Sequence, residues 1–284
     1  MSKKVAINQD ERKQRLDVLE KINTYERLGG ENFFKDVEVD PPYSTLMPND
    51  VDYTCKKLST KIKTFFAGIV AKVWSSKVCK DFQIEVVGIE NAKAIKGGAV
   101  ITSNHFSIFE NVAVRRVVEK AGRKGDFYKV IREGNYFMPG IIGFLLKYQK
   151  TLPLSSNLKT MMNFSKAVDY YLKTGKFVLI YPEQAMWWNY RKPRPFKIGA
   201  FHYAVKADVP VLPCFVTMQD LDELDSAGFN KQKYTINVMP AIYPDKNLSQ
   251  KENETIMANK NFELCKAKYE EVYGKPLVYA EEES

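Results

Sequence analysis

Short apolar runs alternate with helical stretches from about residue 82 to residue 244. Seven runs rich in β-branched and aromatic residues are interpreted as strands: FQIEVVGIE, GAVITSN, DFYKVIR, KTLPLS, KFVLIYP, VPVLPCFVTM and YTINVMPAIYP. Helices are expected between them, after SNH, after SSN and around GAFHYAVKA. Strands that alternate with helices usually form a parallel sheet covered by helices. The pattern therefore predicts an α/β fold with a mainly parallel seven-stranded sheet flanked by helices.

The N-terminal part of the chain has a helical pattern instead. A charged helix is expected over about residues 9–28, and the stretch EVDPPYSTLMPND that follows predicts turns. Residues 53–82 then predict a basic amphipathic helix, which suits either a membrane interface or packing on the protein's own core. Its apolar positions are Leu58, Ile62, Phe65, Phe66, Ile69, Val70, Val73 and Trp74, and its lysines are Lys56, Lys57, Lys61, Lys63, Lys72, Lys77 and Lys80.

These patterns divide the chain into three parts. Residues 1–81 are expected to form an N-terminal helical segment, a candidate for membrane-surface docking, and residues 82–245 are expected to form the α/β core. Residues 246–284 are expected to form a closing amphipathic helix followed by the acidic tail AEEES. The 13-residue stretch at 136–148, YFMPGIIGFLLKY, predicts an acyl-chain wall, a membrane-facing helix or an ordinary buried helix.

Composition and charge narrow the class of protein. An apolar fraction of 45% is sufficient for a real core. The charged N-terminus does not resemble a secretory signal, and no apolar stretch reaches the ~18 residues of a spanning helix, so a cytosolic chain is expected. The net charge of +9 indicates an anionic partner: nucleic acid, an anionic lipid surface or a phosphorylated substrate.

Cysteine and histidine are sparse. The four cysteines stand far apart, and the chain has only two histidines, so we expect buried reduced thiols and no zinc site. The cysteines are Cys55, Cys79, Cys214 and Cys265. Of the two histidines, His202 lies in a predicted helix without a carboxylate at a useful spacing, so we expect it to be a packed or surface residue.

The stretch SNHFSIFE, residues 103–110, carries the other histidine. His105 is expected in the turn between a strand that ends near Ser103 and a helix that begins near Ser107, and open α/β sheets place their chemistry at such strand ends. Glu110 can fold back and hold one ring nitrogen protonated, which leaves the other nitrogen as a base. Alternatively, Ser107 and Glu110 form a capping box. The two interpretations do not exclude each other, because the cap can orient the pair.

Two later stretches complete an ordered set of blocks. FVLIYPEQAMWW places Glu183 at another strand end, and KPRPFKIGAFHYAVKADVPVLPCFV gives a basic loop, a helix and a strand that opens with Val209. Together with VVGIENAKAIKGGAVITSNHFSIFEN, this order resembles the glycerolipid acyltransferase family, typified by bacterial 1-acylglycerol-3-phosphate acyltransferases. The resemblance covers about residues 85–213, so the α/β core over residues 82–245 is expected to be acyltransferase-like.

Individual positions match this family to different degrees. Asn104, His105 and Glu110 match its first block, with glutamate where the family has aspartate. Its third block, Phe-Pro-Glu-Gly-Thr-Arg, corresponds to Tyr-Pro-Glu-Gln-Ala-Met at residues 181–186. The family's second block ends in an arginine that is implicated in holding the phosphate of the acceptor, and Ser156 stands there in this chain. Because these two blocks are altered, the resemblance does not determine which acceptor the protein uses.

The resemblance implies transfer of an acyl group from an acyl-carrier-protein or coenzyme A thioester to a lysophospholipid, by default 1-acylglycerol-3-phosphate. It implies no metal and no bound cofactor. The catalytic residues would be His105 and Glu110. The residues expected to bind substrate are Asn104, Arg132, Glu183, Arg191, Lys192 and Arg194, although exposed basic residues are more often simply solvated.

Competing interpretations come from other classes of protein. No G-x-S-x-G elbow, no Walker loop and no nucleic-acid motif occurs in the sequence. The charge alone fits a non-catalytic basic protein that binds anionic membrane surfaces. In either case we expect peripheral association with the inner face of the cell membrane. The pair Trp187-Trp188 suits a pocket, a bilayer interface or the core.

Overall fold

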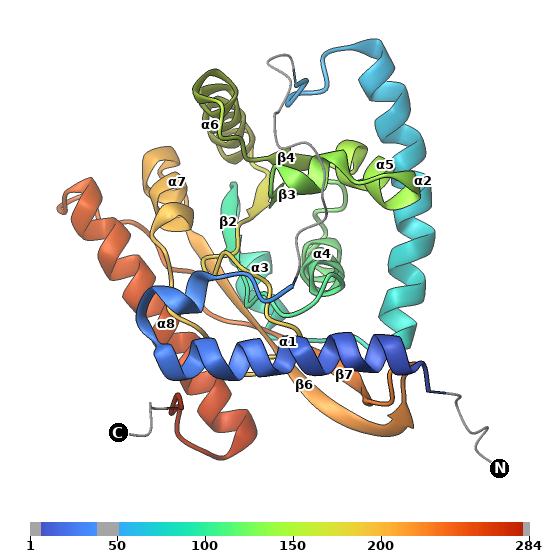
Figure 1. Cartoon of the computed structure of the whole chain (residues 1–284). Helices are drawn as coiled ribbons and strands as arrows, with labels where there is room; N and C mark the ends of the chain where they lie inside the picture. The colour runs from blue at the N-terminus through green and yellow to red at the C-terminus, as the bar shows by residue number, and fades with distance from the viewer. Residues whose placement is uncertain (1–6, 39–50, 281–284) are drawn as a thin grey trace.

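A seven-stranded sheet forms the centre of the computed structural model, which describes residues 7–38 and 51–280 (Figure 1). The strand order is β1-β7-β6-β2-β5-β3-β4, and every pairing is parallel except that of β6 with β7. The strands are β1 (Glu85–Val87), β2 (Ala99–Thr102), β3 (Phe127–Ile131), β4 (Thr151–Pro153), β5 (Phe177–Leu179), β6 (Val211–Leu224) and β7 (Asn230–Val238). The predicted α/β fold is confirmed, and each of the seven predicted runs contributes one strand.

Helices cover both faces of this sheet. The helices of the described chain are α1 (Gln9–Leu28), α2 (Leu58–Asp81), α3 (Ile89–Ala94), α4 (Glu110–Lys120), α5 (Gly140–Tyr148), α6 (Leu158–Lys173), α7 (Gly199–Ala207) and α8 (Gln250–Tyr273), with 3-10 turns η1 (Gly30–Phe34) and η2 (Gly134–Phe137). One apolar cluster joins α6, α7 and α8 to the sheet through residues such as Val100. The next residue along β2, Ile101, belongs to the cluster beneath α3 and α4. Successive β2 side chains thus face opposite layers, as the pleat requires.

The hairpin of β6 and β7 is longer than the apolar pattern predicts. The sequence suggests strands that end at Met218 and begin at Tyr234, yet the ladder continues to a pairing of Leu224 with Asn230. The added residues are mostly polar and mostly exposed, so they show no regular alternation of apolar and polar positions. The hairpin loop is closed by Asp225, whose Oδ1 accepts hydrogen bonds from two backbone N–H groups within it.

Helix α1 crosses the front of the molecule and packs on the loop that follows β5 (Figure 1). Val18 and Ile22 form a cluster with Ala185 and Trp187. Trp187 is fully buried, stacks on Phe33, and donates its indole N–H to the Lys35 carbonyl oxygen at 2.9 Å. Of the roles considered for the tryptophan pair, Trp187 therefore takes the core position.

Helix α2 runs along one side of the molecule, next to α5 and α4 (Figure 1). Over the described residues, no helix combines the length and the apolarity needed to cross a bilayer. The turns predicted over residues 39–50 and the acidic tail over residues 281–284 lie outside the described residues.

Candidate active site

The turn after β2 presents His105 at the carboxyl edge of the sheet. Ahead of it, the buried Asn104 side chain bonds the backbone of Val216 in both directions, donating at 3.0 Å and accepting at 2.8 Å. These two bonds fix the turn to β6, the neighbouring strand. Asn104 was predicted to bind substrate; in the structure both polar atoms of its amide bond the Val216 backbone.

His105 and Glu110 form a close pair. The ring Nδ1 lies 2.7 Å from Oε1 of Glu110, which is the first residue of α4 and is fully buried. The His105 side chain is 21% exposed, so part of the ring reaches the surface. A carboxylate on Nδ1 favours the tautomer with a proton on that nitrogen, which leaves the lone pair on Nε2. The structure therefore brings the two predicted catalytic residues together in the geometry of a base and its orienting acid.

The predicted capping box is wrong. Ser107 Oγ accepts a hydrogen bond from the Phe109 backbone N–H at 3.1 Å, in a local turn ahead of the helix. Helix α4 begins at Glu110 rather than near Ser107, and no side chain of the described residues caps it. The Glu110 carboxylate cannot reach back to the cap because it faces the imidazole. Of the two interpretations of this stretch, the structure contains only the histidine–glutamate pair.

Tyr181, which follows β5, covers one face of the imidazole. Its ring lies parallel to that of His105, with centroids 3.9 Å apart and an interplanar angle of 9°. Burial raises the pKa of the Tyr181 phenol, and the charge of Glu110 raises it further. The phenol therefore stays protonated, and the stacked ring fixes the plane in which His105 presents Nε2.

Glu183 lies beneath the same turn and forms a buried ion pair. Its Oε2 accepts hydrogen bonds from the His105 backbone N–H at 3.0 Å and from Arg194 Nη2 at 2.9 Å. Its Oε1 accepts from the Arg194 backbone N–H at 3.0 Å. Burial lowers the pKa of Arg194 and the Glu183 charge opposes this shift, so the guanidinium remains charged.

This arrangement differs from the sequence interpretation of Glu183 and Arg194 as substrate ligands. Both side chains are buried, and the Arg194 guanidinium also donates to the carbonyl oxygens of Phe33, Ala185 and His105. Their hydrogen bonds are made within the protein, where they join the turn of His105 to the loop after β5. The structure therefore gives them a supporting position behind the histidine.

The remaining predicted substrate ligands form ion pairs at or near the surface. Arg132 lies 2.9 Å from Asp36, Arg191 lies 2.6 Å from Asp220, and Lys192 pairs with Glu26 of α1. None of these three contacts involves His105 or Glu110. Their predicted binding of an acceptor phosphate stays a prediction.

Ser156 stands where the family has its arginine, and its polar groups are held by Glu133. The Glu133 carboxylate accepts from the Ser156 hydroxyl at 2.9 Å, from the Ser156 backbone N–H at 3.1 Å and from the Ser155 hydroxyl at 3.1 Å. A carboxylate thus faces the position at which the resemblance would place a cation. This difference bears on the acceptor rather than on the His105–Glu110 pair.

The second histidine has a partner that the sequence did not reveal. His202 Nδ1 lies 2.9 Å from Glu254 Oε1, although the prediction assigned it no carboxylate. The partner is contributed by α8, 52 residues further along the chain, beyond any local spacing. The expectation that His202 is a packed or surface residue agrees with its 41% side-chain exposure.

Two further residues near Glu110 were not predicted. Lys129 of β3 donates to Asn111 Oδ1 at 3.1 Å, and Asn111 directly follows Glu110. The lysine in the middle of the run DFYKVIR could have singled out this position, because strand residues that face a helix are normally apolar.

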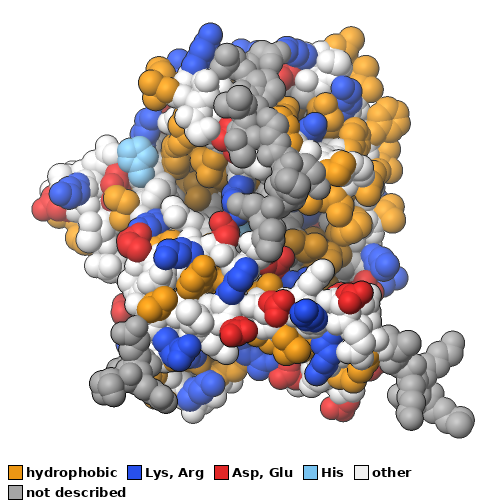
Figure 2. All heavy atoms as spheres, in the orientation of Figure 1, with side chains coloured by type: hydrophobic (Ala, Val, Ile, Leu, Met, Phe, Trp, Pro, Cys, Tyr) orange, Lys and Arg blue, Asp and Glu red, His pale blue; other side chains and the backbone are white. Residues whose placement is uncertain are grey.

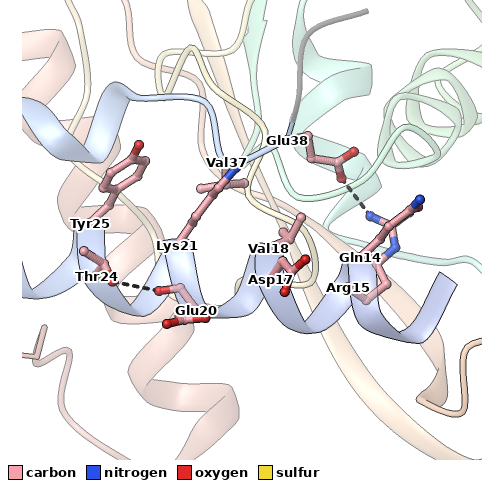
Figure 3. Close-up of a pocket in the computed structure, with 10 residues that line it drawn as sticks. All are labelled: Gln14, Arg15, Asp17, Val18, Glu20, Lys21, Thr24, Tyr25, Val37 and Glu38. Atoms are coloured by element: carbon pink, nitrogen blue, oxygen red, sulfur yellow. Dashed lines mark hydrogen bonds and ion pairs between the residues drawn. The ribbon is translucent and has the colours of Figure 1, made fainter. Parts of the chain in front are cut away.

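A groove of about 650 Å³ lies elsewhere, along α1, and Figure 3 shows its lining. Charged and polar side chains make up most of this lining, and Arg15 pairs there with Glu38 at 2.8 Å. None of the residues around His105 contributes to the groove. In the described part of the chain, no group of three or more histidine, cysteine, aspartate or glutamate residues is placed to hold a metal ion.

Comparisons with known proteins find similarity to acyltransferases. Residues 83–217 match the family model described as Acyltransferase. Over 150 residues the chain is 27% identical to a chloroplastic 1-acyl-sn-glycerol-3-phosphate acyltransferase, BAT2, of Brassica napus, which covers 52% of this chain and 41% of that protein. The chain thus spans less than half the length of this curated relative.

The fold is also similar to a solved structure, the 1-acyl-sn-glycerophosphate (LPA) acyltransferase PlsC from Thermotoga maritima. The TM-score is 0.52 at 17% sequence identity, and the match covers 78% of this chain and 99% of that chain. This likeness shows a shared fold. His105, Glu110 and Glu183 all lie inside the segment that the family model matches. Over residues 83–217, the chain is therefore similar to the acyltransferases that this family model describes.

Proposed function

We propose that this protein is an O-acyltransferase that moves a fatty acyl group from a thioester donor to a hydroxyl of a lysophospholipid. The observation that carries the proposal is the 2.7 Å contact between His105 and the buried Glu110, at a strand end inside the acyltransferase segment. A partly exposed imidazole held by a buried carboxylate is suited to act as a general base.

In the proposed reaction, Nε2 of His105 takes the proton from the acceptor hydroxyl. The acceptor oxygen attacks the thioester carbonyl carbon, the C–S bond breaks, and the departing thiolate receives the proton from the imidazolium. Glu110 holds the ring and stabilises its charge while the proton is on Nε2. Tyr181 keeps the ring plane fixed through its stacked contact. No covalent acyl-enzyme and no metal is part of this scheme.

We propose 1-acylglycerol-3-phosphate as the acceptor, in phospholipid synthesis. The two relatives described above carry this acceptor in their names, which supports the choice. The donor is an acyl-carrier-protein or coenzyme A thioester, both of which deliver the acyl group through the same thioester carbonyl. An assay with each donor separates the two.

The proposal includes docking on the inner face of the cell membrane. Helix α2 turns its small residues Ala67 and Ala71 inward and exposes large apolar side chains along most of its length. Figure 2 shows apolar side chains gathered over α2 and α5, with basic residues among them. The exposed members are Leu58, Ile62, Phe65, Phe66, Ile69, Val73 and Trp74 of α2 and Ile141 and Ile142 of α5. Apolar area rimmed by lysines favours an anionic lipid surface.

This docking is tested by flotation with vesicles that contain anionic lipid. Replacing Phe65 and Val73 by serine removes apolar area from the exposed side of α2 and should strongly reduce flotation. A matched control replaces Ile256 and Val272, which are exposed on α8, by serine and should leave flotation unchanged. Equal flotation of both variants would contradict docking through α2.

The function is tested with a panel of acceptors. Purified protein is incubated with labelled acyl thioester and with lysophosphatidate, lysophospholipids of other headgroups or glycerol 3-phosphate, and the acylated products are separated. We expect product with lysophosphatidate and little with the others. Flotation without turnover on any acceptor would favour the rival function, a non-catalytic basic protein on anionic membranes.

A further inference from the structure

Lys129 occupies an unusual place in the sheet. Along β3 the side chains alternate, and Tyr128 and Val130 pack in the cluster beneath α6 and α7. Phe127 faces the other way and packs in the cluster beneath α3 and α4. Lys129 shares the face of Phe127, because residues two apart on a strand point the same way. Lys129 thus places a cation on the face of β3 that packs against α4, where the neighbouring side chains are apolar.

The ammonium of Lys129 is directed to the start of α4. It donates to Asn111 Oδ1 at 3.1 Å, and the Asn111 amide donates in turn to the Ile108 carbonyl oxygen at 2.7 Å. Burial lowers the pKa of Lys129 to about 8, the charge of Glu110 acts in the opposite direction, and Arg115 adds to the lowering. Lys129 and Glu110 therefore interact electrostatically in a buried layer between the sheet and α4.

One oxygen of the buried Glu110 carboxylate has no hydrogen bond among the described residues. Its Oε1 contacts His105, while its buried Oε2 has no hydrogen-bond partner among the described residues. The Tyr181 hydroxyl is buried nearby and interacts with the Glu110 carboxylate, although no partner lies within hydrogen-bond distance of it among the described residues. A buried carboxylate with one unsatisfied oxygen is costly unless a positive charge lies close to it. Lys129 contributes a positive charge, and its interaction with Glu110 raises the Lys129 pKa against the effect of burial.

We propose that Lys129 is a positioning residue of the site, whose ammonium balances the buried Glu110 carboxylate and so sets the pH at which His105 becomes an unprotonated base. The catalytic part of this inference rests on the proposed acyl transfer, whereas the electrostatic part does not. Other charged or titratable groups that face the pair are Arg115, Tyr181, Tyr234 and the buried pair of Glu183 and Arg194.

The direction of the effect follows from the charges. With Lys129 neutralised, the negative charge of Glu110 is less opposed, so the imidazolium form of His105 is stabilised and the ring keeps its proton to higher pH. An active base must be unprotonated. The acid limb of the activity profile is therefore expected to move to higher pH as well.

The test uses NMR titration of the full chain with isotopically labelled histidine. The chain holds only His105 and His202, and a His105→Ala sample assigns the two sets of signals. In Lys129→Met we expect the titration midpoint of His105 to rise by roughly one pH unit, while that of His202 stays in place. Lys150→Met is the matched control, since Lys150 lies on the neighbouring chain segment and interacts with Asp126 rather than with Glu110.

A second variant separates charge from hydrogen bonding. Lys129→Gln loses the charge but retains a donor for Asn111, so its His105 midpoint should rise as far as in Lys129→Met. A folded Lys129→Met protein with an unmoved midpoint would overturn the inference, as would a shift confined to Lys129→Met. If the midpoint rises but no variant, wild type included, transfers an acyl group, the inference about Lys129 holds and the proposed function fails.

Discussion

The two histidines of this chain invite comparison, because each bonds a glutamate through Nδ1. The distances are 2.7 Å for His105–Glu110 and 2.9 Å for His202–Glu254, and both carboxylates are buried. Their surroundings differ. His105 sits in the turn after β2 with one ring face covered by Tyr181, whereas His202 lies on α7, 41% exposed, with Gln250 also 3.0 Å from the same ring nitrogen.

The comparison shows that a histidine–carboxylate contact is not sufficient to identify a base. Around His105, the backbone of the turn is held by Asn104, Glu183 and Arg194, and Lys129 adds charge behind Glu110. The His202 contact instead links α7 to α8, and Gln250 and Glu254 come from one helix. Position at the carboxyl edge of the sheet, together with this support, distinguishes the first pair.

The largest expected difference is in activity. His105→Ala should lower kcat/KM by about 10³-fold or more, because the general base is lost. His202→Ala removes a comparably bonded imidazole and should leave kcat/KM within about twofold of wild type, since His202 links α7 to α8 outside the proposed site. Steady-state assays of both variants, with circular dichroism as a check of folding, measure the difference. Similar losses of kcat/KM in the two variants would contradict a catalytic role that belongs to His105 and not to His202.

The support beneath His105 should be visible in stability. Arg194→Met leaves Glu183 as an unpaired buried charge and should lower the free energy of unfolding by about 3–5 kcal/mol. Lys197→Met is the control, because its partner Glu31 is 81% exposed and such pairs contribute about 1 kcal/mol or less. Urea denaturation of both variants gives the two values. A cost for Arg194→Met as small as that of Lys197→Met would contradict the supporting role.

The carboxylates of Glu110 and Glu254 should also differ in their contribution to kcat. Glu110→Gln keeps the size of the side chain but cannot stabilise an imidazolium, so kcat should fall by about 10²-fold or more. Glu254→Gln changes the other pair in the same way and should leave kcat unchanged. Rapid-quench measurement of the acyl-transfer step compares the two. A silent Glu110→Gln variant would show that the 2.7 Å contact is structural only.

The smallest expected effect concerns Lys129 and pH. Because its folded pKa of about 8 lies below the ordinary value of 10.5, the folded protein binds fewer protons than the unfolded chain between these pH values. This group therefore costs stability below pH 8, and the cost disappears as the pH rises toward 10.5. Lys129→Met should therefore lack the rise of about 1–3 kcal/mol in the free energy of unfolding that this group gives wild type between about pH 8 and pH 10.5. A constant difference across this range, measured by urea denaturation, would contradict the buried-charge account.

Much of the fold was predictable because its signal is local. The strands of the core alternate with helices and are rich in β-branched residues, so each run marks one strand, and the pair His105 and Glu110 is only five positions apart. The polar extension of the β6–β7 hairpin carried no such signal. The start of α4 was misplaced because Ser107 bonds within a turn instead of capping the helix.

Contacts between distant segments were beyond the sequence pattern. The pairing of His202 with Glu254 and the bonds from Asn104 to Val216 join residues far apart in the chain. Arg194 looked like an exposed ligand because it lies in a basic loop, and only packing against α1 and η1 reveals that it is buried. Of these residues, Lys129 could have been noticed in the sequence, because it is a charged residue in the middle of an otherwise apolar strand.

The central claim is that this chain transfers acyl groups to a lipid hydroxyl, and product stoichiometry tests it most directly. Purified wild-type protein is given acyl thioester with and without lysophosphatidate, and released thiol and doubly acylated lipid are measured in the same samples. The account predicts that thiol appears only with the acceptor, one for each molecule of product formed, and that His105→Ala forms neither. Thiol release without acylated lipid, or no turnover with any acceptor and donor, would contradict it.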